Sequence, residues 1–186
     1  MRVLLGVSGG IAAYKAAILV RRLQDSGHQV RCAITRSAPR FVSPLTLEVL
    51  TGHAVYSESY LEARGKAEEE HIAAAQWADV LCVAPATANT LARLSLGLAE
   101  DFLSTTALAF EGTLFVAPAM HAAMWGKPEV QENMARLQAR GVRVLGPVEG
   151  ALASGERGMG RMLEPEEIVA AIDASRSEGI LSGHRI

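Results

Sequence analysis

The chain alternates short apolar runs, rich in β-branched residues, with longer helical stretches, and this order constrains its fold more than any other feature. Such alternation is typical of a parallel sheet that is covered by helices on both faces. The expected strands are residues 2–7, 29–34, 80–84, 113–117 and 142–145. The sequence therefore predicts an α/β fold with a doubly wound parallel sheet.

Helical periodicity and turn residues indicate the segments that cover this sheet. Residues 12–26 repeat apolar positions at helical spacing and are followed by Gly27, while Ser43 and Gly52 suit the two ends of a second helix. Further helices are expected at residues 89–98, 102–110, 128–140 and 165–174. The glutamate-rich stretch 56–70 lacks clear periodicity, so we expect a mobile connection there.

Composition limits the class of protein. The 186 residues suffice for one buried core, so we expect a single domain at 1–175 and a tail at 176–186. A net charge of -2 without a basic patch argues against nucleic-acid binding, and the apolar run 3–7 is too short for a signal peptide or membrane anchor. We therefore expect a cytoplasmic protein. Cys32 and Cys82 lie in apolar strands without partners at metal-ligand spacing, which predicts two core thiols and no metal site.

In an open parallel sheet, ligands bind beyond the carboxyl ends of the strands. Gly9 and Gly10 follow the first strand and open a helix, where free amides attract a phosphate, although a glycine turn also serves simple close packing. Thr35 and Ser37 follow the second strand, where a dinucleotide enzyme usually has an acidic residue. The two loops together favour a mononucleotide such as FMN over NAD.

The third and fourth strands lead into proline-containing loops. Residues 85–90 read Pro-Ala-Thr-Ala-Asn-Thr, in which Thr87 can also serve as a helix cap. Residues 118–125 read Pro-Ala-Met-His-Ala-Ala-Met-Trp, an apolar composition that is unusual for a loop facing solvent. We therefore expect a large apolar group to cover the second of these loops.

These segments resemble those of the homo-oligomeric flavin-containing cysteine decarboxylases, over nearly the whole chain. Residues 8–15 are similar to the family's FMN-phosphate loop, residues 85–90 to its P-A-S-A-N-T motif, and residues 118–125 to its P-x-M-N-x-x-M-W motif. The resemblance implies a Rossmann-like or flavodoxin-like fold, assembly into trimers or dodecamers, and FMN near the interface between subunits. The implied FMN contacts are Ser8, Gly9, Gly10, Ile11, Thr35, Ser37, Thr87, Ala88, Asn89, Thr90 and Ala119.

The resemblance also implies a reaction, the decarboxylation of phosphopantothenoylcysteine in coenzyme A biosynthesis. The flavin oxidises the substrate cysteine to a thioaldehyde, which loses carbon dioxide readily and leaves an enethiol that is then reduced. The family's catalytic histidine precedes a Trp-Ala-Asp segment, which here corresponds to His71 ahead of residues 77–79. Without the family, a histidine after three glutamates would be taken for a surface residue.

Two positions depart from the family pattern. His121 replaces the asparagine that binds the substrate carboxylate, but an imidazole can also donate a hydrogen bond or carry a positive charge. Residues 153–162 resemble the flexible substrate clamp, in which Ser154 replaces a cysteine that helps to reduce the enethiol; a hydroxyl is a much weaker acid than a thiol. The implied substrate contacts are His121, Met124, Ala153, Gly155 and Arg161, with Ser154 beside His71 as a catalytic residue.

Two other functions remain open on the sequence. A peptidyl-cysteine decarboxylase that stops at the enethiol would accommodate Ser154, whereas residues 158–165 are more similar to the coenzyme A branch. A non-catalytic regulatory flavoprotein is the other alternative, and the presence of His71 argues against it. Residues 181–186 resemble the opening of a phosphopantothenate-cysteine ligase domain, so we expect the chain to be part of a longer bifunctional protein; a frayed tail is the plain alternative.

Overall fold

A five-stranded parallel sheet forms the centre of the molecule. The computed structural model describes residues 1–57, 67–151, 153 and 155–182. The strands are β1 (Arg2–Val7), β2 (Gln29–Ile34), β3 (Val80–Ala86), β4 (Thr113–Pro118) and β5 (Arg143–Val144). Their order is β2-β1-β3-β4-β5, with every neighbouring pair parallel. This is the flavodoxin-like strand order, which confirms the predicted fold class.

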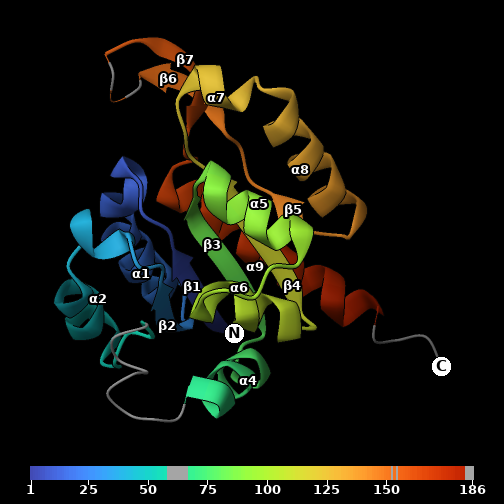
Figure 1. Cartoon of the computed structure of the whole chain (residues 1–186). Helices are drawn as coiled ribbons and strands as arrows, with labels where there is room; N and C mark the ends of the chain where they lie inside the picture. The colour runs from blue at the N-terminus through green and yellow to red at the C-terminus, as the bar shows by residue number, and fades with distance from the viewer. Residues whose placement is uncertain (58–66, 152, 154, 183–186) are drawn as a thin grey trace.

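Helices cover both faces of the sheet (Figure 1). On one face lie α1 (Lys15–Asp25), α2 (Pro44–Thr51) and α9 (Pro165–Ser182), and on the other lie α4 (Ala67–Trp77), α5 (Ala88–Leu96), α6 (Phe102–Ala109) and α8 (Pro128–Ala139). The short elements η1 (Ile11–Tyr14), η2 (Ala38–Arg40) and α7 (Ala122–Trp125) occupy strand-end loops. The doubly wound arrangement thus follows from two separate layers of helix-to-sheet packing.

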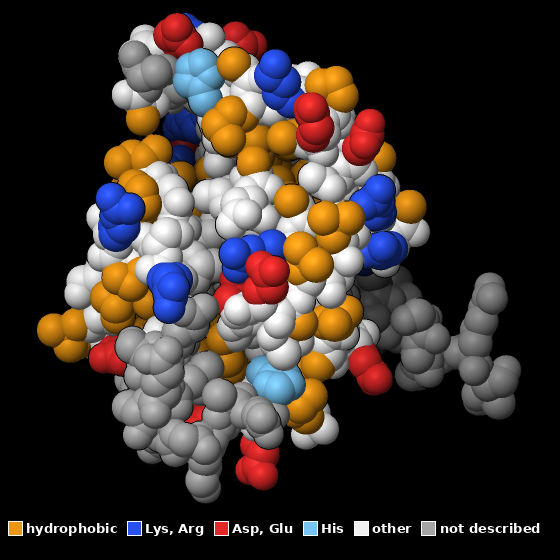
Figure 2. Space-filling model, in the orientation of Figure 1, with side chains coloured by type: hydrophobic (Ala, Val, Ile, Leu, Met, Phe, Trp, Pro, Cys, Tyr) orange, Lys and Arg blue, Asp and Glu red, His pale blue; other side chains and the backbone are white. Residues whose placement is uncertain are grey.

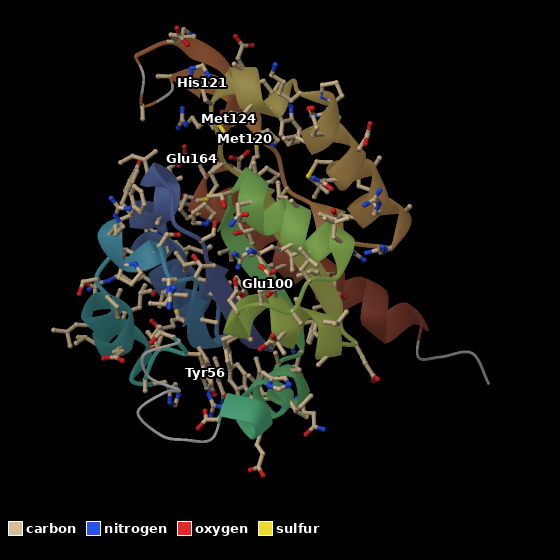
Figure 3. The ribbon with its side chains drawn as sticks, viewed as in Figure 1. Tyr56, Glu100, Met120, His121, Met124 and Glu164 are labelled. Atoms are coloured by element: carbon tan, nitrogen blue, oxygen red, sulfur yellow. The ribbon has the colours of Figure 1, made fainter. Side chains whose placement is uncertain are left out.

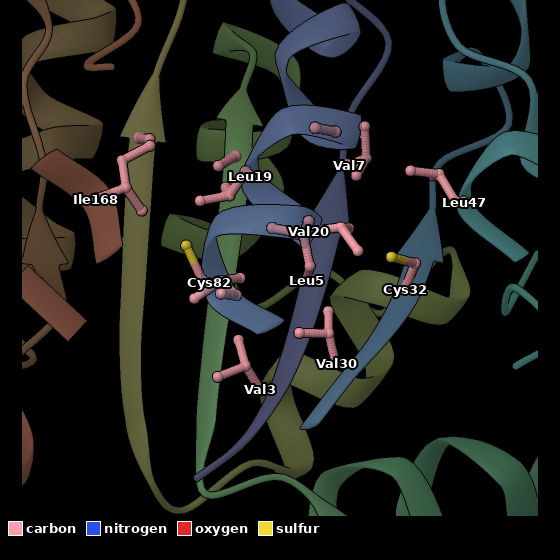
Figure 4. Close-up of a cluster of buried hydrophobic side chains, with 14 of the residues drawn as sticks. Val3, Leu5, Val7, Leu19, Val20, Val30, Cys32, Leu47, Cys82 and Ile168 are labelled. Atoms are coloured by element: carbon pink, nitrogen blue, oxygen red, sulfur yellow. The ribbon is translucent and has the colours of Figure 1, made fainter. Parts of the chain in front are cut away.

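Alternating side chains of the strands supply the two cores. In β1, Val3, Leu5 and Val7 pack under α1, whereas Leu4 points to the opposite core, and all four are fully buried. Figure 4 shows the first of these cores, where the strands meet Leu19 of α1. Because a central parallel strand buries both faces, its sequence is continuously apolar, which is why its bounds were predictable.

The two cysteines are part of this core. Cys32 and Cys82 are free thiols with almost no exposed surface, as expected from their apolar surroundings. Burial raises the pKa of each thiol to about 12, because the charged thiolate is poorly solvated in the core. Both side chains therefore act as small apolar groups.

Helix α4 is the main difference from the predicted secondary structure. The expected connection at 56–70 is wrong at its end, because residues 67–70 form the first turn of α4, and residues 58–66 lie outside the described part of the chain. Glutamate and alanine are strong helix formers, and acidic groups in a first turn favour a helix N-terminus. Among residues 69–77 of α4, the buried side chains are the small ones of Ala74 and Ala75, so the sequence shows little amphipathic pattern.

A two-stranded antiparallel hairpin, β6 (Val148–Ala151) and β7 (Arg157–Arg161), lies beyond the carboxyl ends of the sheet strands (Figure 1). Strand β7 lies within residues 153–162, the segment expected to be a flexible clamp, and β6 precedes that segment. The hairpin was not predicted as β-structure, because glycine is unfavourable in strands and is frequent in this stretch. Helix α9 also extends further than expected, past residue 174 to Ser182.

Candidate functional site

The strand order reverses between β1 and β3, and loops leaving these two strands diverge at that point. In this fold, ligands bind at such a switch point. Ser8 joins the two loops: its hydroxyl donates to the Pro85 carbonyl at 2.7 Å and accepts from the Thr87 amide at 3.0 Å. Ser8 is buried, so its side chain holds the edges of the site at a fixed separation.

A cavity of about 570 Å³ lies between these loops and the β6–β7 hairpin. Figure 2 shows a hollow beneath the hairpin that is bordered mainly by hydrophobic side chains. A volume of this size suits a flavin-sized or drug-sized ligand. The lining residues are Gly10, Ile11, Ala12, Tyr14, Lys15, Thr87, Ala88, Ala119, Met120, His121, Met124, Ala151, Ala153, Gly160, Arg161 and Met162.

The first two loops pack closely on each other. A Cβ atom added at Gly9 would lie 2.7 Å from the carbonyl carbon of Ser37 and would overlap its side chain, so only glycine fits there. The hydroxyls of Ser37 and Thr35 are 3.5 Å apart beside this glycine. No side chain caps the start of η1 at Gly10, whose extended backbone leads into the helix. The arrangement suits an anion held by backbone amides and two hydroxyls.

The third loop begins α5 with a side-chain cap. Thr87 accepts a hydrogen bond from the amide of Thr90 at 3.4 Å, and the two hydroxyls lie 3.1 Å apart. Thr87 and Ala88 also line the cavity, whereas Thr90 is buried and supports the cap. A Cβ atom at Gly10 would approach the Thr87 methyl group to 3.2 Å, so the first and third loops meet there.

The fourth loop carries Met120, His121 and Met124 to the cavity wall and meets the hairpin (Figure 3). The amide of Met120 donates to the carbonyl of Gly160 at 3.0 Å. A Cβ atom added at Gly160 would overlap the Met120 carbonyl oxygen, so the absence of a side chain permits the hairpin to dock. His121 caps α7, and its Nε2 atom lies 2.9 Å from Oε2 of Glu156 in the hairpin loop.

A charged group fixes the base of the hairpin to α1. Lys15 Nζ lies 3.0 Å from Oε1 of Glu164, and the same oxygen accepts from Arg161. The Lys15 ammonium, followed by the Arg161 guanidinium, lowers the pKa of the Glu164 carboxyl below its usual value, although partial burial opposes the shift. One carboxylate therefore faces two cations at the cavity edge.

Residues from the first, third and fourth strand-end loops and from the hairpin line the cavity, whereas the second loop packs on Gly9 without lining it. Nine of the predicted residues line the cavity directly: Gly10, Ile11, Thr87, Ala88, Ala119, His121, Met124, Ala153 and Arg161. Ser8, Gly9, Thr35, Ser37, Asn89, Thr90 and Gly155 are not part of this lining. Ser154 lies outside the described residues.

His71 lies apart from this cavity. It belongs to α4, which occupies the end of the molecule opposite the hairpin, and it does not line the cavity (Figure 1). Figure 3 shows the same separation between Tyr56, which lies near α4, and His121. The expected catalytic histidine and the expected substrate loop are therefore not adjacent within one chain.

Several cavity residues were missed from the sequence. Tyr14 and Lys15 stand within the segment that resembles the FMN-phosphate loop, and Met162 follows the predicted clamp contact Arg161, but none was singled out. The signal for Lys15 was available: a lysine among the apolar positions of a core helix has to reach a partner. Among the described residues, no group of three His, Cys, Asp or Glu side chains could hold a metal ion, and no helix is long and apolar enough to cross a membrane.

Comparison with known proteins agrees with this geometry. A family model described as "Flavoprotein" matches residues 1–177. The coenzyme A biosynthesis bifunctional protein CoaBC of Haemophilus influenzae is 44% identical over 170 residues, covering 91% of this chain and 42% of that protein. CoaBC of Bacillus subtilis is 47% identical over 167 residues, covering 90% of this chain and 41% of that protein. The chain thus spans less than half the length of these relatives.

Solved structures also show similarity to decarboxylases over nearly the whole chain. A PPC decarboxylase variant complexed with pantothenoylaminoethenethiol has a TM-score of 0.86 and 32% identity, covering 95% of this chain and 98% of that one. The FMN-dependent cysteine decarboxylase SpaF has a TM-score of 0.80 and 34% identity, covering 94% of this chain and 97% of that one. The expected resemblance to flavin-containing cysteine decarboxylases is confirmed, and the flavoprotein match agrees with the expected flavin cofactor. On fold, cavity and sequence together, the chain belongs to the flavoprotein family.

Proposed function

We propose that this domain decarboxylates phosphopantothenoylcysteine to phosphopantetheine with FMN as its cofactor. The observation that carries the proposal is the cavity at the switch point, which joins the glycine loop after β1 to the methionine-rich loop after β4 and to the hairpin. Relatives named for coenzyme A biosynthesis and PPC decarboxylase support the choice of substrate.

The loops around Gly9 fit the phosphate of FMN. Gly9 has no side chain and packs directly against Ser37, and Thr35 and Ser37 place two hydroxyl groups beside it. Bound FMN supplies the two-electron oxidation of the substrate thiol and the return of those electrons to the enethiol. The chain's own residues bind the substrate and move its protons, and the hairpin excludes water from it.

Replacement of Gly9 by alanine tests the cofactor loop. The added methyl group would collide with the side chain and the carbonyl carbon of Ser37, so we expect the purified variant to lose most of its FMN. Gly126→Ala is the matched control, because the nearest atom to its added Cβ would be 3.8 Å away. Absorbance at the flavin bands and chromatography of the released cofactor measure the effect; FAD or NAD in place of FMN would contradict the proposal.

The position of His71 supports a site completed by a neighbouring subunit. His71 lies at the opposite end of its own chain from the cavity, yet the base has to reach the substrate thiol (Figure 1). In a cyclic trimer, one end of each subunit contacts the other end of the next, which brings α4 of one chain to the cavity of another. We propose this arrangement, with the imidazole removing the thiol proton, a task to which imidazole is well suited near neutral pH.

Mixed oligomers test this arrangement. His71→Asn subunits keep an intact cavity, and His121→Ala subunits keep an intact histidine, so neither should be active alone. In randomly mixed cyclic trimers, about one quarter of the sites would combine two intact halves, and activity should recover toward that fraction. No recovery, in oligomers shown by mass to be mixed, would place His71 and the cavity of the same chain in one site.

Mass spectrometry of the reaction with phosphopantothenoylcysteine tests the reaction itself. Loss of carbon dioxide alone indicates complete conversion to phosphopantetheine. A further loss of two hydrogens indicates that the enethiol accumulates, the outcome expected if Ser154 cannot support reduction. Absence of both products would favour the non-catalytic flavoprotein.

The wider context is also a proposal. The shorter span of this chain relative to CoaBC proteins supports a fused phosphopantothenate-cysteine ligase domain beyond residue 186, with residues 1–175 as the decarboxylase and 176–186 as the connection. The boundary at 175 falls inside α9, and residues 183–186 lie outside the described part. We place the protein in the cytoplasm, whose reducing conditions suit the free thiols of Cys32 and Cys82. The gene sequence after codon 186 and cell fractionation test these points.

A further inference from the structure

The hydrogen bonds of His121 define which of its ring nitrogens carries the proton. Nδ1 accepts from the amide of Ala123 at 3.2 Å, the bond by which His121 caps α7. A ring nitrogen that accepts a hydrogen bond holds no proton, so the proton resides on Nε2. Nε2 accordingly donates to Oε2 of Glu156 at 2.9 Å.

The donor of this bond belongs to the cavity, whereas the acceptor belongs to the hairpin. His121 lines the cavity on the loop after β4. Glu156 directly precedes β7, and β7 is docked on the same loop through the bond between Met120 and Gly160. The structure therefore places one carboxylate of the protein on the one N–H group that His121 can offer to a ligand.

Glu156 is also free to leave this position. Its side chain is 67% exposed, so little desolvation holds it there. Gly155, its neighbour, has a φ of +84° and no atom within 4 Å of the position of a Cβ atom. The exposed pair is weak, and the backbone beside it has room to turn.

We propose that Glu156 competes with the substrate's carboxylate for the Nε2–H group of His121 and thereby sets the affinity for substrates that carry this carboxylate. The inference rests on the proposed function, in which the carboxylate to be lost is presented to His121. A glutamate side chain and the terminal carboxylate of a cysteine are the same acceptor, so binding of one displaces the other. After decarboxylation the product has no such group, and Glu156 returns to His121 as the product leaves.

Substitution of Glu156 tests this competition in the FMN-loaded enzyme. An internal competitor lowers the fraction of enzyme whose Nε2–H group is free, and the apparent KM rises by the inverse of that fraction. Glu156→Ala should therefore lower KM for phosphopantothenoylcysteine about three- to sixfold, as expected for the loss of one exposed hydrogen bond. Glu156→Gln retains a neutral acceptor and should give a smaller decrease. Inhibition by phosphopantetheine, which lacks the carboxylate, should be unchanged in both variants.

Glu149→Ala is the matched control, because Glu149 is an exposed carboxylate of the same hairpin that does not line the cavity. Its KM should remain that of the unmodified enzyme. A direct readout is the nitrogen NMR spectrum of labelled histidine in the holoenzyme, where the proton of His121 should reside on Nε2 and not on Nδ1. That tautomer should persist when substrate binds.

Each other outcome contradicts the inference in a distinguishable way. An unchanged or increased KM in Glu156→Ala would show that Glu156 does not compete with the substrate. Equal decreases in KM and in the phosphopantetheine inhibition constant would show that Glu156 obstructs the cavity entrance without regard to the carboxylate. If the unmodified holoenzyme does not convert phosphopantothenoylcysteine, the proposed function fails first and the competition fails with it.

Discussion

Replacement of Gly160 by alanine should lower the activity of the enzyme strongly and its stability moderately. The added Cβ atom would overlap the carbonyl oxygen of Met120 and lie 3.2 Å from its carbon and 3.4 Å from the amide nitrogen of Ala122. All three atoms belong to the backbone, so rotation of a side chain cannot relieve the overlap. Since carbon atoms pack best at about 3.5–4.0 Å, β7 has to move by roughly 1 Å from the loop that carries His121.

The expected effect is large on activity and moderate on stability. A displacement of about 1 Å at a substrate-positioning segment can lower a rate by about 100-fold, so kcat/KM should fall by that order. Loss of the hydrogen bond between Met120 and Gly160, with overpacking, should lower the free energy of unfolding by about 2–4 kcal/mol.

Steady-state kinetics and urea unfolding of the holoenzyme measure the two effects. Gly126→Ala is the control, since Gly126 has ordinary helical backbone angles and should tolerate a methyl group with little change in either quantity. A Gly160→Ala variant with full activity and stability would refute the docking of the hairpin on this loop. An equal loss of activity and stability in Gly126→Ala would also refute it, because the effect would then not depend on the contact between the hairpin and this loop.

Three further predictions concern charge and burial. Lys15, followed by Arg161, lowers the pKa of Glu164, so the stability from this carboxylate is present above its usual pKa of 4.5 and is lost as pH falls through the lowered pKa. Glu164→Gln should therefore unfold about 1 kcal/mol more easily at pH 7, and urea titrations should show this difference shrinking as pH falls below 4.5. Asp101→Ala removes the capping box of α6 and should lower the free energy of unfolding by about 1–2 kcal/mol, without change in FMN content. Cys32 and Cys82, with pKa values of about 12, should resist alkylation at pH 8 in the folded protein and react after unfolding; rapid labelling without denaturant, followed by mass spectrometry, would contradict their burial.

The sheet was predictable because its strands are governed by burial on both faces. Strand β1 has the predicted bounds, since its apolar residues are buried on both faces of the sheet. Strand β2 also has the predicted bounds, although it lies at a sheet edge, because Val30, Cys32 and Ile34 alternate with Gln29 and Arg31. Strand β5 is shorter than expected, only Arg143–Val144, because it lies at the sheet edge and pairs with β4 alone. The residues that flank Arg143–Val144 therefore have no second strand to pair with, and the expected strand 142–145 was longer than the strand that forms.

The ligand loops were predictable from a rule of topology, and the contacts between them were not. Gly9 and Ser37 could be assigned to one site because carboxyl ends of parallel strands share one edge of a sheet. The bond between His121 and Glu156 joins two loops through the docking of the hairpin, and nothing in local sequence fixes how far a glycine-rich segment folds back. Tertiary contacts of this kind depend on the whole packing arrangement.

The exposed apolar residues at the cavity bear on how the site is completed. Ile11 and Tyr14 line the cavity, yet they are 62% and 56% exposed in the single chain. Exposed apolar groups beside a binding site are expected to contact a ligand or another protein. The flavin can cover part of this surface, and a neighbouring subunit that brings its His71 to the cavity would cover more of it. The same contact would therefore bury apolar surface and deliver the catalytic base, so substitutions of Tyr14 that weaken the oligomer should also lower the rate of decarboxylation.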